Sequence, residues 1–153
     1  MTRREGVFTK WDGEEVKKRA EKLASKSSFE IGLIVQAQAK LLVPRLTGRL
    51  GASITTASGF GQKTNPSGTG AVGTDTITPP TDPFETFVGT PVDYGPYMEY
   101  GTVRTQAQPF LRPALDIARG RALTVVQVGA RKEFAEYLTT SQLFSQTNEA
   151  FSE

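Results

Sequence analysis

Apolar residues recur at helical spacing in two long stretches, one from about Gly13 to Val43 and one from Pro109 to about Leu138. In the first stretch the recurring side chains are Val16, Ala20, Leu23, Ala24, Ser27, Ile31, Ile34, Val35, Gln38 and Leu42. In the second they are Leu111, Leu115, Ala118, Ala122, Val125, Val126 and Gly129, continued with a small shift by Ala130, Phe134, Tyr137 and Leu138. Steps of three and four residues indicate a helix with one buried side. We therefore predict two long amphipathic helices.

The predicted helix ends carry their own signals. Asp12 is placed to cap the first helix, with Glu15 three residues later. Pro44 ends that helix, because the residue before a proline avoids the α conformation. Pro109 suits the first turn of the second helix, where its missing N–H costs nothing. Gly32 costs about 1 kcal/mol relative to alanine inside a helix, which indicates either a close crossing or a bend.

The region between the helices is extended in character. Residues 50–57 alternate apolar and small polar side chains and predict a strand, and residues 84–90 predict a second strand. Residues 58–83 between them are rich in Gly, Ser, Thr, Asn and Pro, and are longer than an ordinary loop. Either they form a disordered insertion, or they form a β-hairpin arm with a mobile tip. The alternating Val and Thr of residues 72–78 and the turn signal at residues 65–68 favour the arm.

The predicted organisation is one α+β domain at residues 13–139, in which two long helices pack on a small, mostly antiparallel β-sheet. Residues 1–12 are predicted to be an N-terminal arm, residues 140–153 a polar C-terminal tail, and residues 58–83 an extended β-hairpin arm or loop. At 153 residues the chain is long enough to bury a core. It has no run of eighteen apolar residues, so we predict no membrane span.

The chain contains neither cysteine nor histidine. The first absence excludes disulfides and thiol chemistry and fits folding in a reducing cytoplasm. The second removes the commonest general base near neutral pH and the commonest metal ligand. Asp93 and Glu99 flank a tyrosine cluster, but a catalytic carboxylate pair would need a cleft and a raised pKa. We favour Glu99 as a cap or hydrogen-bond partner, and predict no enzyme activity, no catalytic residue, no metal and no cofactor.

Charge is distributed unevenly. Residues 1–50 hold 11 Lys and Arg against 6 Asp and Glu, whereas residues 51–153 hold 7 against 10, so the two parts carry +5 and −3. A basic N-terminal helix surface could meet nucleic acid or an acidic protein. The alternative, which we favour, is a solvated helix face with ordinary Glu–Lys pairing.

The densest cluster of aromatic residues lies between the second strand and the second helix. Three tyrosines fall within seven residues and are interleaved with Gly95 and Pro96. This pattern is typical of a compact corner whose rings fill space while their hydroxyls reach polar partners. It suits a core and a subunit interface equally. The residues that we assign to a candidate subunit interface are Tyr94, Tyr97, Glu99, Tyr100, Arg104, Phe110 and Arg112. Arg112 is expected to bind a carboxylate across that contact.

Two motifs resemble the gp10-like family of phage HK97, a set of tailed-phage neck and tail-completion proteins. Residues 43–54 are similar to the family's Pro-x-x-Thr-Gly-x-Leu-x-x-Ser-Ile. The second motif of the family has three parts. The family's strand ending in Val-Gly is similar to Val88-Gly89, and its Tyr-x-Pro-Tyr-x-Glu-Tyr/Phe-Gly-Thr is similar to residues 94–102. Its helix start, Gln-Pro-Phe-Leu-Arg-Pro-Ala-Leu, is similar to residues 108–115. The resemblance covers about residues 14 to 139, with an insertion between the two motifs.

The resemblance implies a structural protein of the virion neck, assembled in the host bacterial cytoplasm. Its partners would be further copies of itself in a ring, a homohexamer, together with the tail tube protein and head-completion or connector proteins. DNA would pass through the channel without specific binding, and no membrane is involved. Identical subunits close a ring by repeating one heterologous contact. The alternatives are a head-completion ring of another symmetry and, from a different class, a small nucleic-acid-binding protein that uses the basic N-terminal helix.

Overall fold

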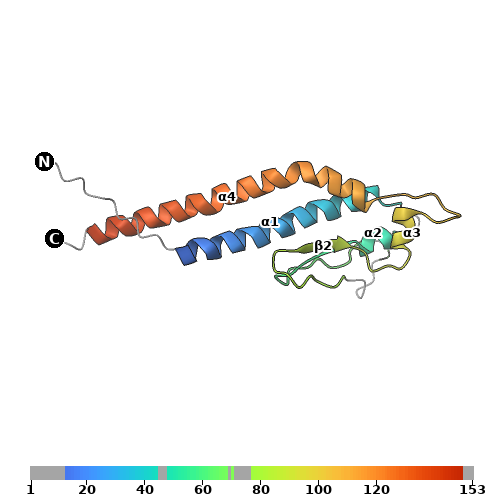
Figure 1. Ribbon diagram of the computed structural model, residues 1–153, viewed down its shortest axis with the longest axis horizontal. Helices are drawn as coiled ribbons and strands as arrows, with labels where there is room; N and C mark the ends of the chain where they lie inside the picture. The colour runs from blue at the N-terminus through green and yellow to red at the C-terminus, as the bar shows by residue number, and fades with distance from the viewer. Residues whose placement is uncertain (1–12, 45–47, 69, 71–76, 150–153) are drawn as a thin grey trace.

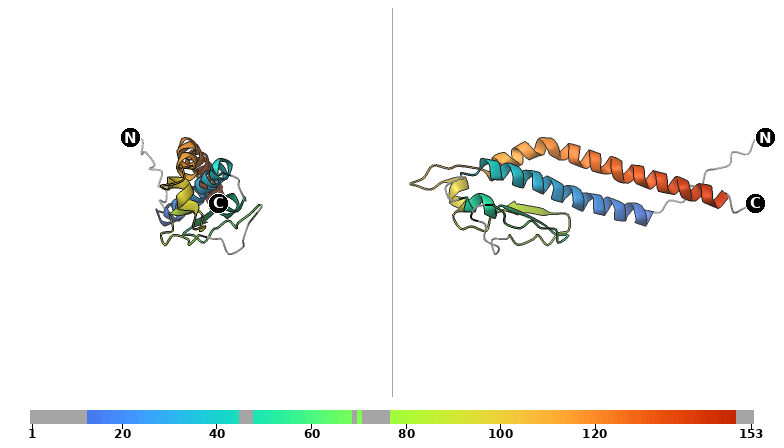
Figure 2. Two further views of the ribbon diagram at one scale, coloured as in Figure 1. Left: turned by 90° about the vertical axis from the view of Figure 1, so that its right-hand side faces the viewer. Right: turned by 180° about the vertical axis from the view of Figure 1, so that it is seen from behind.

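The computed structural model describes residues 13–44, 48–68, 70 and 77–149, with side chains described as far as Ala135. Its two long helices run antiparallel, side by side, and a small sheet lies against one end of the pair, so the molecule is elongated (Figure 1, Figure 2). This arrangement confirms the predicted α+β class. The elements in order are α1 (Gly13–Leu42), α2 (Arg49–Ser53), β1 (Thr55–Ser58), β2 (Thr86–Gly89), α3 (Gly95–Tyr100) and α4 (Leu111–Glu149).

Helix α1 has nearly the predicted bounds. Glu14 and Glu15 stand in its first turn and Lys40 in its last, which complements the helix dipole at both ends. The helix ends at Leu42, just before Pro44, as the proline rule requires. Asp12, the predicted cap, lies outside the described residues.

Helix α4 begins at Leu111 and continues to Glu149, so the prediction of a helix ending near Leu138 is wrong. The polar composition of residues 140–149 predicts a tail. They contain neither glycine nor proline, however, and nothing in their sequence therefore stops a helix that has already formed. Among the described residues, no helix is long and apolar enough to cross a membrane.

The strand predicted to begin at Leu50 is shorter than expected, because residues 49–53 form helix α2 and β1 begins only at Thr55. Leu50 and Ile54 are both buried, and they are four residues apart, a spacing that suits one helical turn as well as an alternating strand. The Ser53 hydroxyl donates to the Leu50 carbonyl at 2.8 Å, which supports the helical turn. Local alternation of small residues was an ambiguous signal here.

Strands β1 and β2 pair antiparallel, with Thr55 opposite Gly89 and Ser58 opposite Thr86. Helix α1 crosses the sheet at Gly32. A Cβ atom at that position would lie 2.6 Å from the Thr86 γ-methyl and 2.8 Å from the Thr56 γ-methyl. The glycine therefore allows the helix to approach the sheet closely, which confirms the close-crossing interpretation.

The described part of the insertion packs on its own subunit and forms no β-hairpin arm. Its contacts with the sheet include an isolated bridge between Ala57 and Lys63 and a backbone hydrogen bond of 2.8 Å from the Thr64 N–H to the Thr56 carbonyl. The Ser67 N–H also donates to the Ala52 carbonyl at 3.0 Å. Val72, Thr74 and Thr76, which favoured the arm, lie outside the described residues, whereas Thr78 is described and lies in no strand.

A buried polar network joins this loop to the core. The Gln36 side chain donates to the Ile54 carbonyl at 2.9 Å. Its Oε1 accepts from the Thr56 hydroxyl at 2.9 Å and from the Thr64 hydroxyl at 3.2 Å. One glutamine of α1 thus holds the residue before β1, the strand itself and the returning loop. The apolar core beside the network comprises Val35, Ala39, Val43, Leu50, Ile54, Val92, Phe110, Ala114 and Ala118.

Candidate functional site

The aromatic corner is a short helix, α3, closed by a glycine. Pro96 stands in the first turn of α3, and Gly101 follows its last residue with φ of 77°. The Gly101 N–H donates to the Tyr97 carbonyl at 2.9 Å. A Cβ atom at Gly101 would lie 2.7 Å from the backbone nitrogen of Ala107, so the position requires glycine both for its backbone conformation and for space.

Glu99 of α3 caps the N-terminus of α4. Its carboxylate accepts backbone N–H groups from Phe110 at 2.7 Å, from Leu111 at 2.9 Å and from Arg112 at 3.0 Å. The next residue, Pro113, has no N–H to satisfy. Every backbone donor that the first turn leaves without an intrahelical partner is therefore accounted for. The capping role predicted for Glu99 is confirmed.

The same contacts determine the protonation of Glu99, which is 6% exposed. Burial by itself raises the pKa of the carboxyl group, but the three backbone N–H donors and the Arg112 charge outweigh it and lower the pKa below its ordinary value of 4.5. The group is thus an ionised acceptor at neutral pH. A general acid of a carboxylate pair needs the opposite shift.

The tyrosines of the corner face solvent in the single chain, with Tyr97 60% and Tyr100 64% exposed. The guanidinium carbon of Arg112 lies 4.8 Å from the centroid of the Tyr100 ring, a cation–π contact that holds the arginine against the corner. The alternative in which these rings fill the subunit's own core is therefore wrong. A carboxylate partner for Arg112 from another subunit stays a prediction.

The remaining predicted interface residues differ from one another. Phe110 is fully buried in the core of its own subunit, so it supports the corner from inside and offers no surface to a neighbour. Arg104 is exposed on the loop between α3 and α4, which projects beyond the end of the helix pair (Figure 1). Tyr94 is partly exposed at the start of α3. The structure thus gathers the predicted residues at one end of the molecule.

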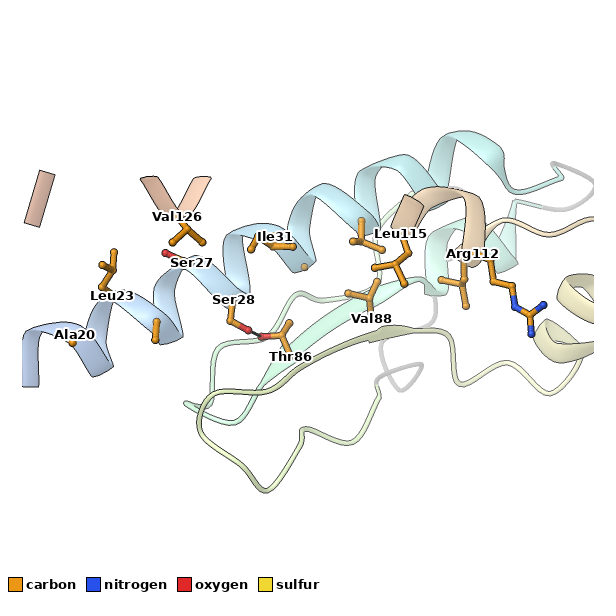
Figure 3. Close-up of a pocket in the computed structure, with 14 residues that line it drawn as sticks. Ala20, Leu23, Ser27, Ser28, Ile31, Thr86, Val88, Arg112, Leu115 and Val126 are labelled. Atoms are coloured by element: carbon orange, nitrogen blue, oxygen red, sulfur yellow. Dashed lines mark hydrogen bonds between the residues drawn. The ribbon is translucent and has the colours of Figure 1, made fainter. Parts of the chain in front are cut away.

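A second feature, which the sequence did not reveal, is an apolar groove of about 700 Å³ between α1, β2 and the first part of α4 (Figure 3). At its edge the hydroxyls of Ser28 and Thr86 hydrogen-bond at 2.8 Å and join α1 to β2. The residues that line the groove are Ala20, Leu23, Ala24, Ser27, Ser28, Ile31, Gly32, Val35, Thr86, Val88, Leu111, Arg112, Leu115 and Val126.

The predicted buried stripe of α4 is only partly covered. Ala118 is buried as expected, but Leu115 and Val126 are each more than two fifths exposed. Leu123 is 72% exposed and Val128 60% exposed, although α1 lies alongside. Because α1 covers one side only, α4 carries more apolar surface than its own subunit buries.

The basic character of α1 is interrupted by carboxylates. Lys17, Lys18 and Lys22 are exposed, but the Arg19 guanidinium bonds the Glu15 carboxylate at 2.8 Å on the same helix. Glu14 is also exposed in the first turn. The described surface of α1 mixes both charges, and the ion pair cited here joins a glutamate to an arginine, so the predicted Glu–Lys pairing stays a prediction.

Within the part of the chain that the structure describes, no group of three or more His, Cys, Asp or Glu side chains is placed to hold a metal ion. Comparison of the chain with protein-family models, with curated proteins and with solved structures finds no match.

Proposed function

We propose that the chain is a ring-forming structural subunit of a tailed-phage neck, a tail-completion protein that joins the tail tube to the head connector around the DNA channel. The observation that carries the proposal is the apolar surface that α4 leaves uncovered, with Leu123 at 72% and Val128 at 60% exposure. Large apolar side chains that a subunit leaves exposed can be covered by contact with another protein.

The shape of the subunit favours repeated contact between different faces. The groove is lined by α1, β2 and residues of α4 that extend as far as Val126, whereas the exposed Leu123 and Val128 of α4 do not line it. Two different surfaces on one chain favour a heterologous contact, and a heterologous contact that closes after a whole number of subunits gives a ring. The tyrosine-bearing corner at the sheet end supplies a further surface rich in the residues that interfaces favour.

The resemblance of residues 43–54 and 88–115 to the gp10-like family supplies the biological setting. The described residues fit a structural role, since the acidic residue of the second motif, Glu99, is engaged in capping a helix. The mixed charges of α1 give less support to the nucleic-acid-binding alternative, which needs a continuous basic surface.

The test is the mass of the assembled form, measured on purified neck complexes or on the chain at high concentration. A closed ring of identical subunits, six in the proposed form, is the expected result. A stable dimer that persists inside particles would contradict the proposal. Particles made without this chain should accumulate as unjoined heads and tails, and the wild-type chain supplied separately should restore joining.

A further inference from the structure

Helix α4 changes direction close to the sheet end of the molecule. It first runs away from α1, and it then turns and continues beside α1 towards the far end (Figure 1, Figure 2). The groove lies under this bend. Leu115 and Val126 of α4 line it, and no described residue between them does (Figure 3). The helix therefore arches over the groove, and the bend is what returns its far part to α1.

The two glycines of α4 that could cause the bend differ in their surroundings. Helix kinks have a local cause, most often a proline or a small residue such as glycine, and Pro113 stands in the first turn, where a proline is tolerated. A Cβ atom at Gly129 would lie 2.9 Å from Leu23 Cδ1 and 3.4 Å from Ser27 Oγ, so this glycine allows the two helices to approach closely. A Cβ atom at Gly120 would meet nothing within 4 Å, and Gly120 has no positive φ.

Gly120 thus serves neither close packing nor a left-handed backbone conformation. Glycine is less favourable than alanine inside a helix, because its backbone keeps more freedom in other conformations. That freedom is what Gly120 adds to α4. The bend is therefore attributed to Gly120.

The same glycine separates a packed part of α4 from an open one. Before it, Ala114 and Ala118 are fully buried in the core. After it, no side chain of residues 119–135 is buried. The first part is held by the core, whereas the second part lies against α1 with most of its surface in water. Movement of the second part consequently exposes little additional surface, which is typical of segments that open locally.

We propose that Gly120 is a hinge of α4. In the bent position, which the structure shows, the far part of α4 lies beside α1 with Gly129 against Leu23. In the straightened position the far part continues away from α1 and this contact opens. The hinge then sets how much apolar surface of both helices the subunit offers to a neighbour. A hinge within the single chain does not depend on the proposed ring.

The absence of cysteine allows pairs of spin labels to measure distances within the full-length chain. The pair Lys22→Cys with Lys132→Cys joins exposed positions of α1 and α4 at the far end, so it spans the hinge. The pair Ala37→Cys with Asp116→Cys is the control, because both exposed positions lie on the sheet side of the hinge. Labelled chain is mixed with an excess of unlabelled chain, so that distances between copies do not contribute.

A third pair, Arg121→Cys with Phe134→Cys, lies wholly beyond the hinge. It reports whether the far part of α4 stays helical when it moves, because thirteen helical residues place the two backbones about 20 Å apart. A swinging helix keeps this distance narrow, whereas a melting helix makes it broad.

The expected result is two populations for the Lys22–Lys132 pair and one for the Ala37–Asp116 pair. Gly120→Ala should raise the population at the longer distance at least about threefold, because alanine favours a regular, straight helix. Gly129→Leu should raise it as well, since a leucine side chain does not fit against Leu23 in the bent position. The matched control is Gln127→Ala, an exposed position beyond the hinge, which should leave both populations unchanged.

Three outcomes would overturn the hinge. One is a single Lys22–Lys132 population that neither Gly120→Ala nor Gly129→Leu changes. Another is a broad Arg121–Phe134 distance in the unsubstituted background, because the far part of α4 would then melt instead of swinging. The third is a response to Gln127→Ala as large as the response to Gly120→Ala, which would assign the change to helix propensity alone.

Discussion

The two ends of the α1–α4 pair differ in how completely they are packed. Every fully buried apolar side chain among the described residues lies between Val35 and Ala118, at the sheet end. At the far end, residues 13–31 of α1 bury only Ser27, and residues 119–135 of α4 bury none. The sheet end is a closed module with its own polar network, whereas the far end is an open pair of helices.

The contrast indicates which part of the chain folds by itself and which part needs a partner. Most helical stability in proteins comes from packing of an apolar side, and propensity adds little. The sheet end has that packing within one chain. The far end keeps Leu123 and Val128 in water until another surface covers them. Stability should therefore reside at the sheet end and self-association at the far end and in the groove.

The largest effect is expected at the polar network of the sheet end. Gln36→Ala removes the side-chain donor to the Ile54 carbonyl and the buried acceptor of the Thr56 and Thr64 hydroxyls, and it opens a small cavity, so the free energy of unfolding should fall by about 3 kcal/mol. Gln38→Ala, two residues along the same helix and only half-buried, should change it by less than about 0.5 kcal/mol. Urea denaturation at constant m-value measures both. Equal losses would show that the network is not what stabilises this end.

The next effect concerns the cap that joins α3 to α4. Glu99→Ala removes the acceptor of three backbone N–H groups and should lower the free energy of unfolding by about 2 kcal/mol. Glu85→Ala, an exposed glutamate before β2, serves as the control and should be nearly neutral. Thermal unfolding compares the two. An unchanged melting temperature in Glu99→Ala would contradict the cap.

A smaller effect follows from the lowered pKa of Glu99. A carboxyl group whose pKa is lower in the folded state contributes stability that is fully present above its unfolded pKa, near 4.5, and is lost as pH falls through the lower folded value. The stability difference between wild type and Glu99→Gln should therefore be constant near neutral pH and shrink below about pH 4.5. Denaturation series across this range test it, and a difference that grows on acidification would have the wrong sign.

Glycine substitutions compare the two ends at matched helical positions. Gly32→Ala forces a Cβ atom against the stiff γ-methyls of Thr86 and Thr56, and should lower the free energy of unfolding by about 1 kcal/mol even after the gain in helix propensity. Gly120→Ala meets no atom within 4 Å and should raise it by up to about 1 kcal/mol. Opposite signs are the expected result, and a stabilising Gly32→Ala would show that α1 can move away from the sheet.

The smallest effect on the single chain is expected at the far end. Leu123→Gln with Val128→Gln should change the free energy of unfolding of the monomer by less than about 0.5 kcal/mol, because both side chains are already exposed. The same double substitution should raise the dissociation constant of self-association at least tenfold, which corresponds to about 1.4 kcal/mol. Sedimentation analysis checks the second statement, with Gln127→Ala as an exposed control on the same helix. Unchanged association would exclude this part of α4 from the interface.

The sequence predicted the features that depend on local order. The helical period of the apolar residues and the positions of proline predict where both long helices lie. Gly32 inside the first helix indicates a close crossing or a bend, and the structure shows the crossing. The prediction that Glu99 is a cap or hydrogen-bond partner is confirmed, although the sequence did not identify the N-terminus of α4 as the group that it caps. These signals depend on residues within about a dozen positions of one another.

Features that depend on distant segments were missed. The helical period of α4 marks Leu115 and Val126 as apolar, but it does not say whether another segment covers them. The groove requires α1, β2 and α4 to meet, and the Gln36 network requires residues from three separate segments. Short alternation at residues 50–54 suits a turn of helix and a strand equally, so only the packing of Leu50 and Ile54 against the core decided in favour of the helix.

Hydrogen exchange of the full chain, followed by region across protein concentration, tests the central claim most directly. The account predicts that residues 13–31 and 119–135 exchange readily in dilute solution and gain protection as copies associate, while the amides around Gln36 and β1 are protected at every concentration. Uniform protection along both helices in the dilute chain, or protection that concentration leaves unchanged at the far end, would contradict the claim that neighbouring copies complete the fold.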